Sequence, residues 1–169
     1  MKQQEMKQQQ HYDTISLSYD THYNDFWSNL YLRFCVIPRL FQGLTFSDKT
    51  VMDAMCGTGQ ITGFLKNKGA KNIIGVDISK QQLKQYQDYY SEATSVCASV
   101  TQLPQDACSV DVIIISGGLH HVHPDLNKAI EEFYRILKPG GVLCFSEPHN
   151  KSVLDQIRQF WYKRDPLFE

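Results

Sequence analysis

The residues best suited to chemistry are two acidic side chains on either side of a glycine-rich turn. Residues 51–59 have the sequence V-M-D-A-M-C-G-T-G, so a short apolar segment carries Asp53 and leads into Gly57 and Gly59. Glycine lets the backbone approach a ligand closely or adopt positive φ, and the N-terminus of a following helix favours an anionic group. Asp77 ends a second apolar segment, where a carboxylate accepts hydrogen bonds from both hydroxyls of a ribose. This pattern predicts a nucleoside site.

The spacing of the glycines helps to distinguish between two candidate nucleoside cofactors. The turn has the form Gly57-x-Gly59-x-x-x-Gly63, and Thr62 stands where a dinucleotide-binding fingerprint would have a glycine. A negative charge at Asp53 disfavours a pyrophosphate and tolerates a ligand that carries a positive sulfonium. Both features favour S-adenosylmethionine, while a nicotinamide cofactor stays open as an alternative.

Alternating strands and helices must place these residues together. The strands are predicted at residues 50–54, 72–78, 95–100, 110–116 and 142–147, and the helices at residues 60–68, 79–91, 124–137 and 151–163. Nearly continuous apolar strands separated by helices are typical of an α/β, doubly wound, mostly parallel sheet that is covered on both faces. In such a sheet ligands bind beyond the carboxyl ends of the strands. Asp53 and Asp77 are both predicted at that edge.

Several segments in order resemble one family. Residues 51–59, 76–79 (V-D-I-S), 103–113 (L-P, then S-V-D-V-I), 119–122 (L-H-H-V) and 135–141 (R-I-L-K-P-G-G) match its motifs in sequence and spacing. The chain resembles the class I, Rossmann-like, S-adenosylmethionine-dependent methyltransferases of the small-molecule type, over residues 51–147. The resemblance implies the strand order 3-2-1-4-5 and S-adenosylmethionine as cofactor. Ordered motifs together are far more specific than one glycine turn.

The resemblance also implies which residues bind the cofactor. They are Asp53, Ala54, Met55, Cys56, Gly57, Gly59, Asp77, Ile78, Ser99, Val100, Ser116 and Gly117. Met55 replaces a glycine of the family motif. Ser99 replaces an acidic residue that touches the adenine amino group, and Val100 would offer its backbone N–H to the ring. Transfer of a methyl group to a small-molecule acceptor is the implied activity, and a non-catalytic S-adenosylmethionine-binding module lacking part of the acceptor site is the alternative.

Three residues are candidates for catalysis. Methyl transfer needs the acceptor held in line with the methyl group and a base for its proton. His120 and His121 follow the fourth predicted strand and Glu147 ends the fifth, so each is a candidate base. The structural alternatives are a histidine that caps or packs the next helix and a glutamate that bonds to a neighbouring loop. The histidines lack the i, i+4 spacing of a zinc helix, so no metal is predicted.

The remaining segments suggest three regions. Residues 1–10 are predicted to be a disordered polar tail, and the aromatic-rich residues 11–46 a helical lid in which Tyr12, Tyr19, Tyr23 and Arg33 are candidate ligand contacts. Residues 47–169 form the Rossmann-like core. The core lacks room for the last two strands of the family fold, so the fifth strand is predicted to be an exposed edge. A homo-oligomer or a partner chain that completes the sheet is therefore expected.

Composition limits the other partners. The net charge is −1 and no basic stripe occurs, so no binding of nucleic acid is predicted. No apolar run of about 18 residues is present, so no membrane span is predicted. The chain has five cysteines without a C-x-x-C pair, which favours buried thiols in a reducing compartment, the cytoplasm.

Overall fold

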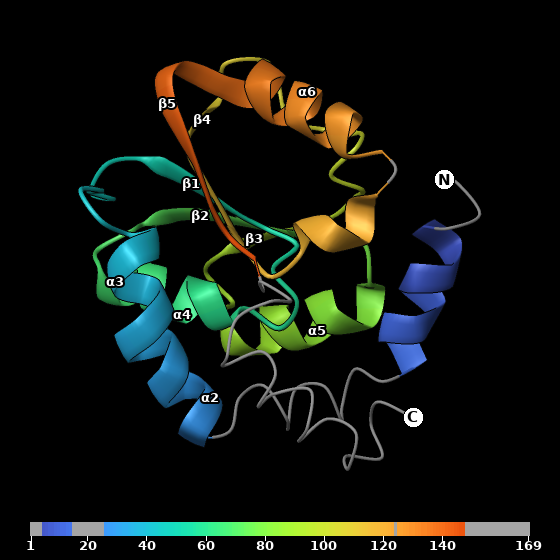
Figure 1. Ribbon diagram of the computed structural model, residues 1–169, viewed down its shortest axis with the longest axis horizontal. Helices are drawn as coiled ribbons and strands as arrows, with labels where there is room; N and C mark the ends of the chain where they lie inside the picture. The colour runs from blue at the N-terminus through green and yellow to red at the C-terminus, as the bar shows by residue number, and fades with distance from the viewer. Residues whose placement is uncertain (1–4, 15–25, 124, 148–169) are drawn as a thin grey trace.

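The core of the protein is a five-stranded parallel sheet with the order β3-β2-β1-β4-β5 (Figure 1). The computed structural model describes residues 5–14, 26–123 and 125–147. The strands are β1 (Thr50–Ala54), β2 (Asn72–Asp77), β3 (Thr94–Cys97), β4 (Val110–Ser116) and β5 (Leu137–Ser146). The predicted fold class and strand order are confirmed.

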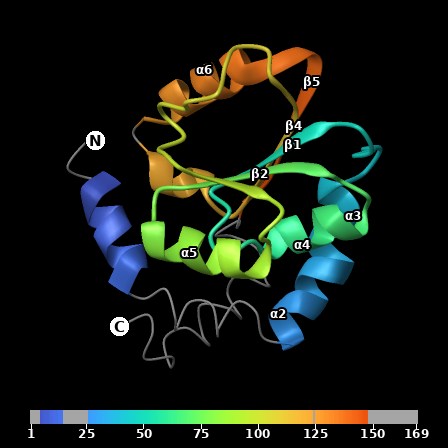
Figure 2. The same cartoon turned by 180° about the vertical axis from the view of Figure 1, so that it is seen from behind.

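Helices cover both faces of this sheet. They are α2 (Phe26–Tyr31), the π-helical turn η1 (Leu32–Val36), α3 (Ile37–Leu40), α4 (Gln60–Asn67), α5 (Lys80–Tyr89), the 3-10 turn η2 (Leu119–Val122) and α6 (Leu126–Ile136). In both views α3, α4 and α5 lie on one side of the sheet and α6 on the other (Figures 1 and 2). No helix of the described ranges is both long and apolar enough to cross a bilayer.

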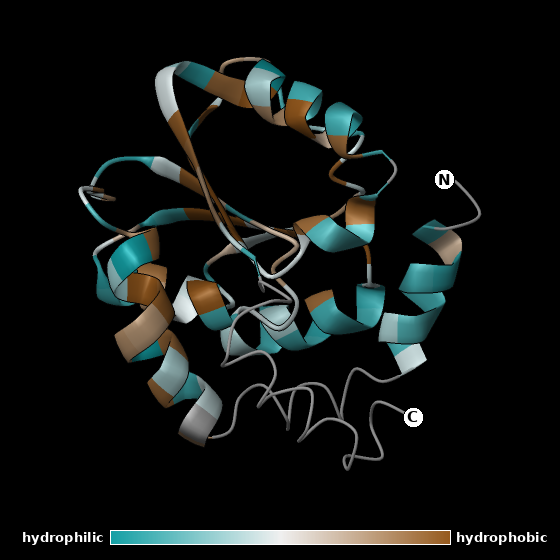
Figure 3. Cartoon of the chain, viewed as in Figure 1, coloured by the Kyte–Doolittle hydropathy of each residue, from teal (hydrophilic) through white to brown (hydrophobic). Residues whose placement is uncertain are grey.

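The hydrophobic core forms one layer on each face of the sheet. Along β4, Val112 and Ile114 join one buried cluster, while Ile113 and Ile115 join the other. This division follows from the alternation of side chains along a strand, and it explains why the central strand segments are apolar almost throughout. In Figure 3 these strands carry long hydrophobic stretches, whereas the helix near the N-terminus is mostly hydrophilic.

Element boundaries differ from the predictions at two strands. β3 ends at Cys97 rather than Val100, so Val100 lies in the loop beyond the sheet. β5 starts at Leu137 rather than Val142 and includes Pro139. A proline is tolerated there because β5 pairs only with β4 among the described strands, and the register shifts between Val110 and Val112 beside it. The helix predicted over residues 151–163 lies outside the described residues.

The N-terminal segment also differs from its prediction. Residues 5–14 form a helix, which we call the N-terminal helix, although the sequence predicted a disordered tail up to residue 10. Glutamine and lysine are good helix formers. Polar side-chain hydrogen bonds hold this helix on the rest of the protein. The prediction of disorder from low hydrophobicity was therefore wrong for residues 5–10. Tyr19 and Tyr23 lie outside the described residues.

Candidate functional site

A large cavity lies at the carboxyl edge of the sheet. It encloses about 920 Å³, its open mouth included, and is lined by the loops after β1 to β4 and by the N-terminal helix. Ligands of open α/β sheets bind at this edge, beyond the carboxyl ends of the strands. Eight of the predicted cofactor-binding residues line it: Met55, Gly57, Asp77, Ile78, Ser99, Val100, Ser116 and Gly117. The structure therefore brings together residues from four separate segments of the chain.

Asp77 joins two of the loops around this cavity. Its Oδ2 accepts a hydrogen bond from the backbone N–H of Gly57 at 2.9 Å, and its Oδ1 accepts one from Ser79 N–H, also at 2.9 Å. Burial raises the pKa of Asp77, and the bonds from Ser79 and Gly57 oppose that rise. Two carboxylate oxygens offer about four acceptor sites, so the group has the capacity to accept ribose hydroxyls as well.

Met55 adopts a backbone conformation that favours glycine. Its φ is +59°, in the left-handed region that favours glycine. Its side chain lies against Gly118, because a Cβ added at Gly118 would come within 2.7 Å of Met55 Sδ. Met55 thus contributes an apolar wall to the cavity from a left-handed position.

Four predicted cofactor residues build the turn instead of lining the cavity. Ala54 is fully buried in β1, and Gly59 takes a φ of +95° at the start of α4. Asp53 is 1% exposed and accepts a hydrogen bond from Thr62 Oγ1 at 2.7 Å. Asp53 and Cys56 line only a smaller neighbouring pocket.

Asp53 should make stability depend on pH. Burial raises its pKa to about 7, against 3.8 for an ordinary aspartate, even though the bond from Thr62 lowers it. The folded state therefore binds this proton more tightly than the unfolded chain does, and the free energy of unfolding falls as the pH rises from about 4 to 7. The variant Asp53→Asn keeps an acceptor for Thr62. We expect its free energy of unfolding, relative to that of the unsubstituted protein, to increase by on the order of 2–3 kcal/mol as the pH rises from 5 to 8. Urea denaturation at both pH values measures this difference.

Comparing the two proteins isolates Asp53 from His121. Burial lowers the pKa of His121 to about 4, so its contribution rises with pH and opposes that of Asp53, but it is the same in both proteins. A stability difference that stays constant from pH 5 to pH 8 would contradict the raised pKa of Asp53.

Gln82 presents an unsatisfied amide to the cavity. It is 1% exposed, and neither its Nε2 nor its Oε1 has a hydrogen-bond partner among the described residues. Sequence analysis did not single it out, and Ser79-x-x-Gln82 has the form of a capping box, which would give the glutamine a structural role. Ser79 Oγ does accept a bond from Gln82 N–H at 3.2 Å, but Asp77 occupies the Ser79 N–H that the Gln82 side chain would otherwise take. The Gln82 amide therefore has no partner within its own capping motif.

The end of the cavity beyond β4 holds a neutral hydrogen-bonded pair. His121 Nε2 and Tyr12 Oη lie 2.8 Å apart. Burial, followed by the charge of His120, lowers the pKa of His121 to about 4, and burial raises the pKa of Tyr12 to about 12. Both side chains are therefore uncharged near pH 7. Gly117, which lines the same cavity, has a φ of +71°, and among the described residues no atom other than those of its chain neighbours lies within 4 Å of the position that a Cβ would take there.

His120 and Glu147 fix the neighbouring loop. The distance between His120 Nδ1 and Glu147 Oε2 is 2.7 Å, and Glu147 Oε1 accepts bonds from the N–H groups of Gly118 and Leu119 at 2.8 and 2.7 Å. Neither side chain is among the residues that line the cavity. Of the three catalytic candidates, only His121 faces the cavity, and Glu147 takes the structural alternative of bonding to a loop.

The N-terminal helix spans the cavity from one loop to the next. Gln8 Nε2 donates to the His121 carbonyl at 2.7 Å, and Asp13 Oδ1 accepts from Ser79 Oγ at 2.5 Å. Glu5 contacts the loop after β3. Of this helix only Tyr12 was a candidate from the sequence. Arg33, the one other candidate among the described residues, is exposed and does not line the cavity. Glu5, Gln8 and Asp13 lie in or beside a Gln-rich segment whose sequence has no motif that indicates a binding role.

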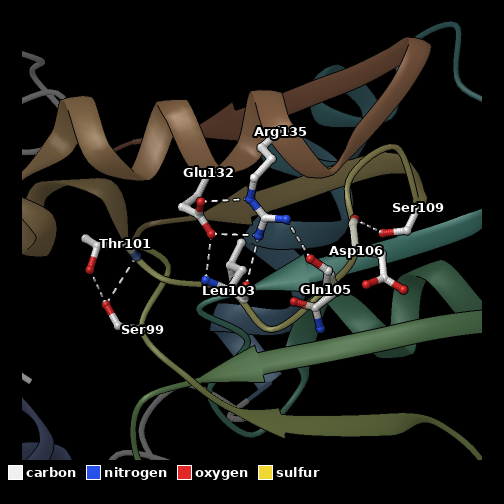
Figure 4. Close-up of polar contacts among 8 residues, drawn as sticks. All are labelled: Ser99, Thr101, Leu103, Gln105, Asp106, Ser109, Glu132 and Arg135. Atoms are coloured by element: carbon white, nitrogen blue, oxygen red, sulfur yellow. Dashed lines mark hydrogen bonds and ion pairs between the residues drawn. The ribbon is translucent and has the colours of Figure 1, made fainter.

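A network on α6 holds the far wall of the cavity in place (Figure 4). Arg135 donates to the carbonyls of Gln105 and Leu103 and pairs with Glu132, whose Oε2 also accepts from Leu103 N–H at 2.8 Å. Hydrogen bonds from a planar guanidinium fix geometry well. The loop that carries Ser99 is therefore anchored at its distal end.

Comparison with known proteins gives a consistent result. Residues 52–145 match the family model described as a methyltransferase domain. A malonyl-[acyl-carrier protein] O-methyltransferase of Salmonella typhimurium is 29% identical over 69% of this chain and 45% of that protein. A demethylmenaquinone methyltransferase of Oceanobacillus iheyensis is 32% identical over 68% of this chain and 50% of that protein. The chain thus spans about half the length of these relatives.

A solved structure has the same fold. It is a candidate S-adenosylmethionine-dependent methyltransferase from Methanococcus maripaludis, with a TM-score of 0.75 at 19% identity, covering 91% of this chain and 72% of that one. The matched family segment runs from β1 to β5 and contains the glycine turn, Asp77 and the loop after β4. The chain belongs to the methyltransferase domain family, with the Rossmann-like fold of its class I members.

Proposed function

We propose that this chain binds S-adenosylmethionine and transfers its methyl group to a small-molecule acceptor. The observation that carries the proposal is one cavity with a carboxylate, Asp77, at the tip of β2 and a neutral imidazole, His121, beyond β4. The order of the strands separates these two groups along the cavity. A ligand with a nucleoside at one end and a reactive group at the other fits this arrangement.

The described residues fit the parts of this cofactor. Asp77 and the unsatisfied amide of Gln82 would hold the ribose hydroxyls. The glycine turn at Gly57, before the N-terminus of α4, suits the carboxylate of the methionine part. When bound, S-adenosylmethionine supplies an electrophilic methyl group on a sulfonium. Ser116 and Gly117 lie where that end of the ligand would meet an acceptor.

His121 is the group best placed to take a proton from the acceptor. It is neutral near pH 7 because its pKa is low, so its imidazole retains a lone pair for a proton. Tyr12 bonds to its Nε2 and would orient the ring or pass the proton on. His120 and Glu147 would act indirectly, by holding the loop that carries His121.

The acceptor belongs to the class of small metabolites or carrier-bound acyl groups. Two relatives are named for methylation of malonyl-[acyl-carrier protein] and of demethylmenaquinone. The net charge of −1 offers little attraction for nucleic acid. The prediction of buried thiols is wrong for Cys35, Cys97 and Cys108, which are exposed. All five cysteines are free, and the cytoplasm stays the predicted location. A homo-oligomer or partner chain along β5, where Phe145 is 57% exposed, likewise stays a prediction.

Calorimetry with S-adenosylhomocysteine tests the proposal. We expect saturable binding that NADH, added in excess, does not displace. Displacement by NADH, or the lack of any binding by S-adenosylhomocysteine, would count against this cofactor. Methyl transfer is then measured with radiolabelled S-adenosylmethionine and acceptors related to those of the relatives.

Gln82→Met should change stability and affinity in opposite directions. Methionine has a similar volume and no polar atoms, so it removes a buried amide without partners and should raise the free energy of unfolding by about 1–2 kcal/mol. The same change should lower the affinity for S-adenosylhomocysteine about tenfold, because one polar contact is lost. Urea denaturation and calorimetry measure the two effects.

Gln85→Met is the matched control. Gln85 lies on the same helix and also has a buried unsatisfied oxygen, but it does not line the cavity. Its substitution should leave the affinity unchanged. Equal affinities for the Gln82 and Gln85 variants would remove Gln82 from the site.

A further inference from the structure

The strand order fixes where the base of the nucleoside would lie, if the proposed function holds. With the ribose at β2 and the acceptor beyond β4, the next strand on the other side of the ribose is β3. The cavity wall after β3 is made by Ala98, Ser99, Val100 and Thr101, with Ile78 from the loop after β2. Apolar side chains here suit the faces of a flat aromatic ring, and its polar edge must meet the hydroxyl groups or their partners.

The hydroxyl groups on this wall converge on one carboxylate. Ser99 Oγ donates to Glu5 Oε1 at 2.5 Å, and Thr101 Oγ1 donates to the same oxygen at 3.0 Å. The two hydroxyl oxygens are 2.8 Å apart, and Ser99 Oγ also accepts from Thr101 N–H at 3.2 Å. Glu5 itself lines the cavity and is half-buried. The polar character of the wall is thus that of a hydrogen-bond acceptor carried by the N-terminal helix.

We propose that Glu5 accepts a hydrogen bond from the 6-amino group of adenine and thereby selects the base of the cofactor. A carboxylate accepts hydrogen bonds and cannot donate them, and the Ser99 and Thr101 hydroxyls both bond to its Oε1. The Glu5 carboxylate can therefore accept a hydrogen bond from an amino group, whereas it would repel the carbonyl oxygen of a 6-oxo purine. Ser99 and Thr101 are positioning residues, because they orient the carboxylate.

The position of Glu5 on the N-terminal helix links base recognition to closure of the cavity. The same helix is held by Gln8 at the loop after β4 and by Asp13 at the start of α5. A bond between Glu5 and the base would add a contact that exists only with ligand present. A test must therefore separate recognition of the base from simple attachment of the helix.

The experiment compares two ligands in calorimetry on the full chain. One is S-adenosylhomocysteine, and the other is its 6-deamino analogue, whose purine carries hydrogen in place of the amino group. The unsubstituted protein should bind the analogue about 10-fold more weakly, the effect of one charge-assisted hydrogen bond. In Glu5→Ala the two affinities should agree to within about twofold, since the partner of the amino group is gone. Glu5→Gln, which keeps a neutral acceptor oxygen, should give a ratio between these limits.

Gln8→Ala is the control for attachment of the helix. It removes a bond from the same helix to the His121 carbonyl, so it should weaken both ligands by the same factor and keep the ratio of about 10. If Glu5→Ala also weakens both ligands equally and keeps the ratio, Glu5 only attaches the helix and the proposal is overturned. The same follows if the unsubstituted protein binds both ligands alike. Failure of S-adenosylhomocysteine to bind at all would instead reject the proposed function on which this inference rests.

Discussion

Asp77→Asn is expected to lower the affinity for S-adenosylhomocysteine about 100-fold. The carboxylate accepts the N–H groups of Gly57 and Ser79, one on each oxygen. An asparagine amide offers only one acceptor oxygen, so its NH₂ group would face one of these N–H donors, and the charge that would bind ribose hydroxyls is lost. Hydrogen bonds to a charged group contribute about 1.5–3 kcal/mol each, and losing one or two of them accounts for the factor. Calorimetry measures it directly.

Asp111→Asn is the matched control for this variant. Asp111 also accepts a backbone N–H, that of Thr50 at 2.9 Å, and it pairs with Lys138 Nζ at 2.7 Å. Thr50 begins β1, so this carboxylate lies at the opposite end of the sheet from the cavity. The substitution should leave the affinity within about twofold. If Asp77→Asn bound the ligand as tightly as Asp111→Asn does, Asp77 would not contact the sugar.

Gly59→Ala is expected to lower the free energy of unfolding by about 3 kcal/mol or more. Gly59 has a φ of +95°, and a Cβ there would lie 2.5 Å from Tyr90 Cε2 and 2.8 Å from Tyr86 Cδ2. A left-handed conformation costs a residue with a Cβ about 1–2 kcal/mol, and forcing extra atoms into a packed site adds about 1–3 kcal/mol. Since Tyr86 is fully buried, it has no room to move away. Urea denaturation gives the change.

Gly43→Ala separates backbone strain from the steric clash. Gly43 has a φ of +72°, but in the part of the chain that the structure describes no atom beyond its chain neighbours lies within 4 Å of a Cβ at that position. Its substitution should therefore cost only the strain, about 1–2 kcal/mol. If both variants lost the same stability, contact with the two tyrosines would not explain the glycine at position 59.

The fold and the cofactor half of the site follow from local features of the sequence. The apolar strands and the turns at their ends are each encoded within a few consecutive residues, and parallel strands bring their carboxyl ends to one edge. Gly57 and Asp77 could therefore be placed without knowledge of distant contacts. Met55 shows the limit of motif matching, because a side chain occurs at a left-handed position where the motif has a glycine.

The rest of the site depends on contacts between segments far apart in the chain. Glu5 bonds to Ser99 across 94 residues and Tyr12 to His121 across 109, and polar residues on a hydrophilic helix carry no pattern that indicates such partners. Gln82 could not be identified from the sequence for a different reason. In a capping box its side chain would accept a hydrogen bond from Ser79 N–H, but Asp77 accepts that bond instead.

The adjacent histidines illustrate a third limit. His120 and His121 lie in one 3-10 turn, and only its path decides which ring faces the cavity and which bonds to Glu147. Sequence spacing did not distinguish them.

A crystal structure of the chain with S-adenosylhomocysteine tests the central claim most directly. We expect both ribose hydroxyls within hydrogen-bond distance of the Asp77 carboxylate, the adenine beside Ser99 and Val100, and the sulfur directed toward Gly117 and His121. A nucleoside bound away from Asp77, or bound with its sulfur beside β3, would contradict the account.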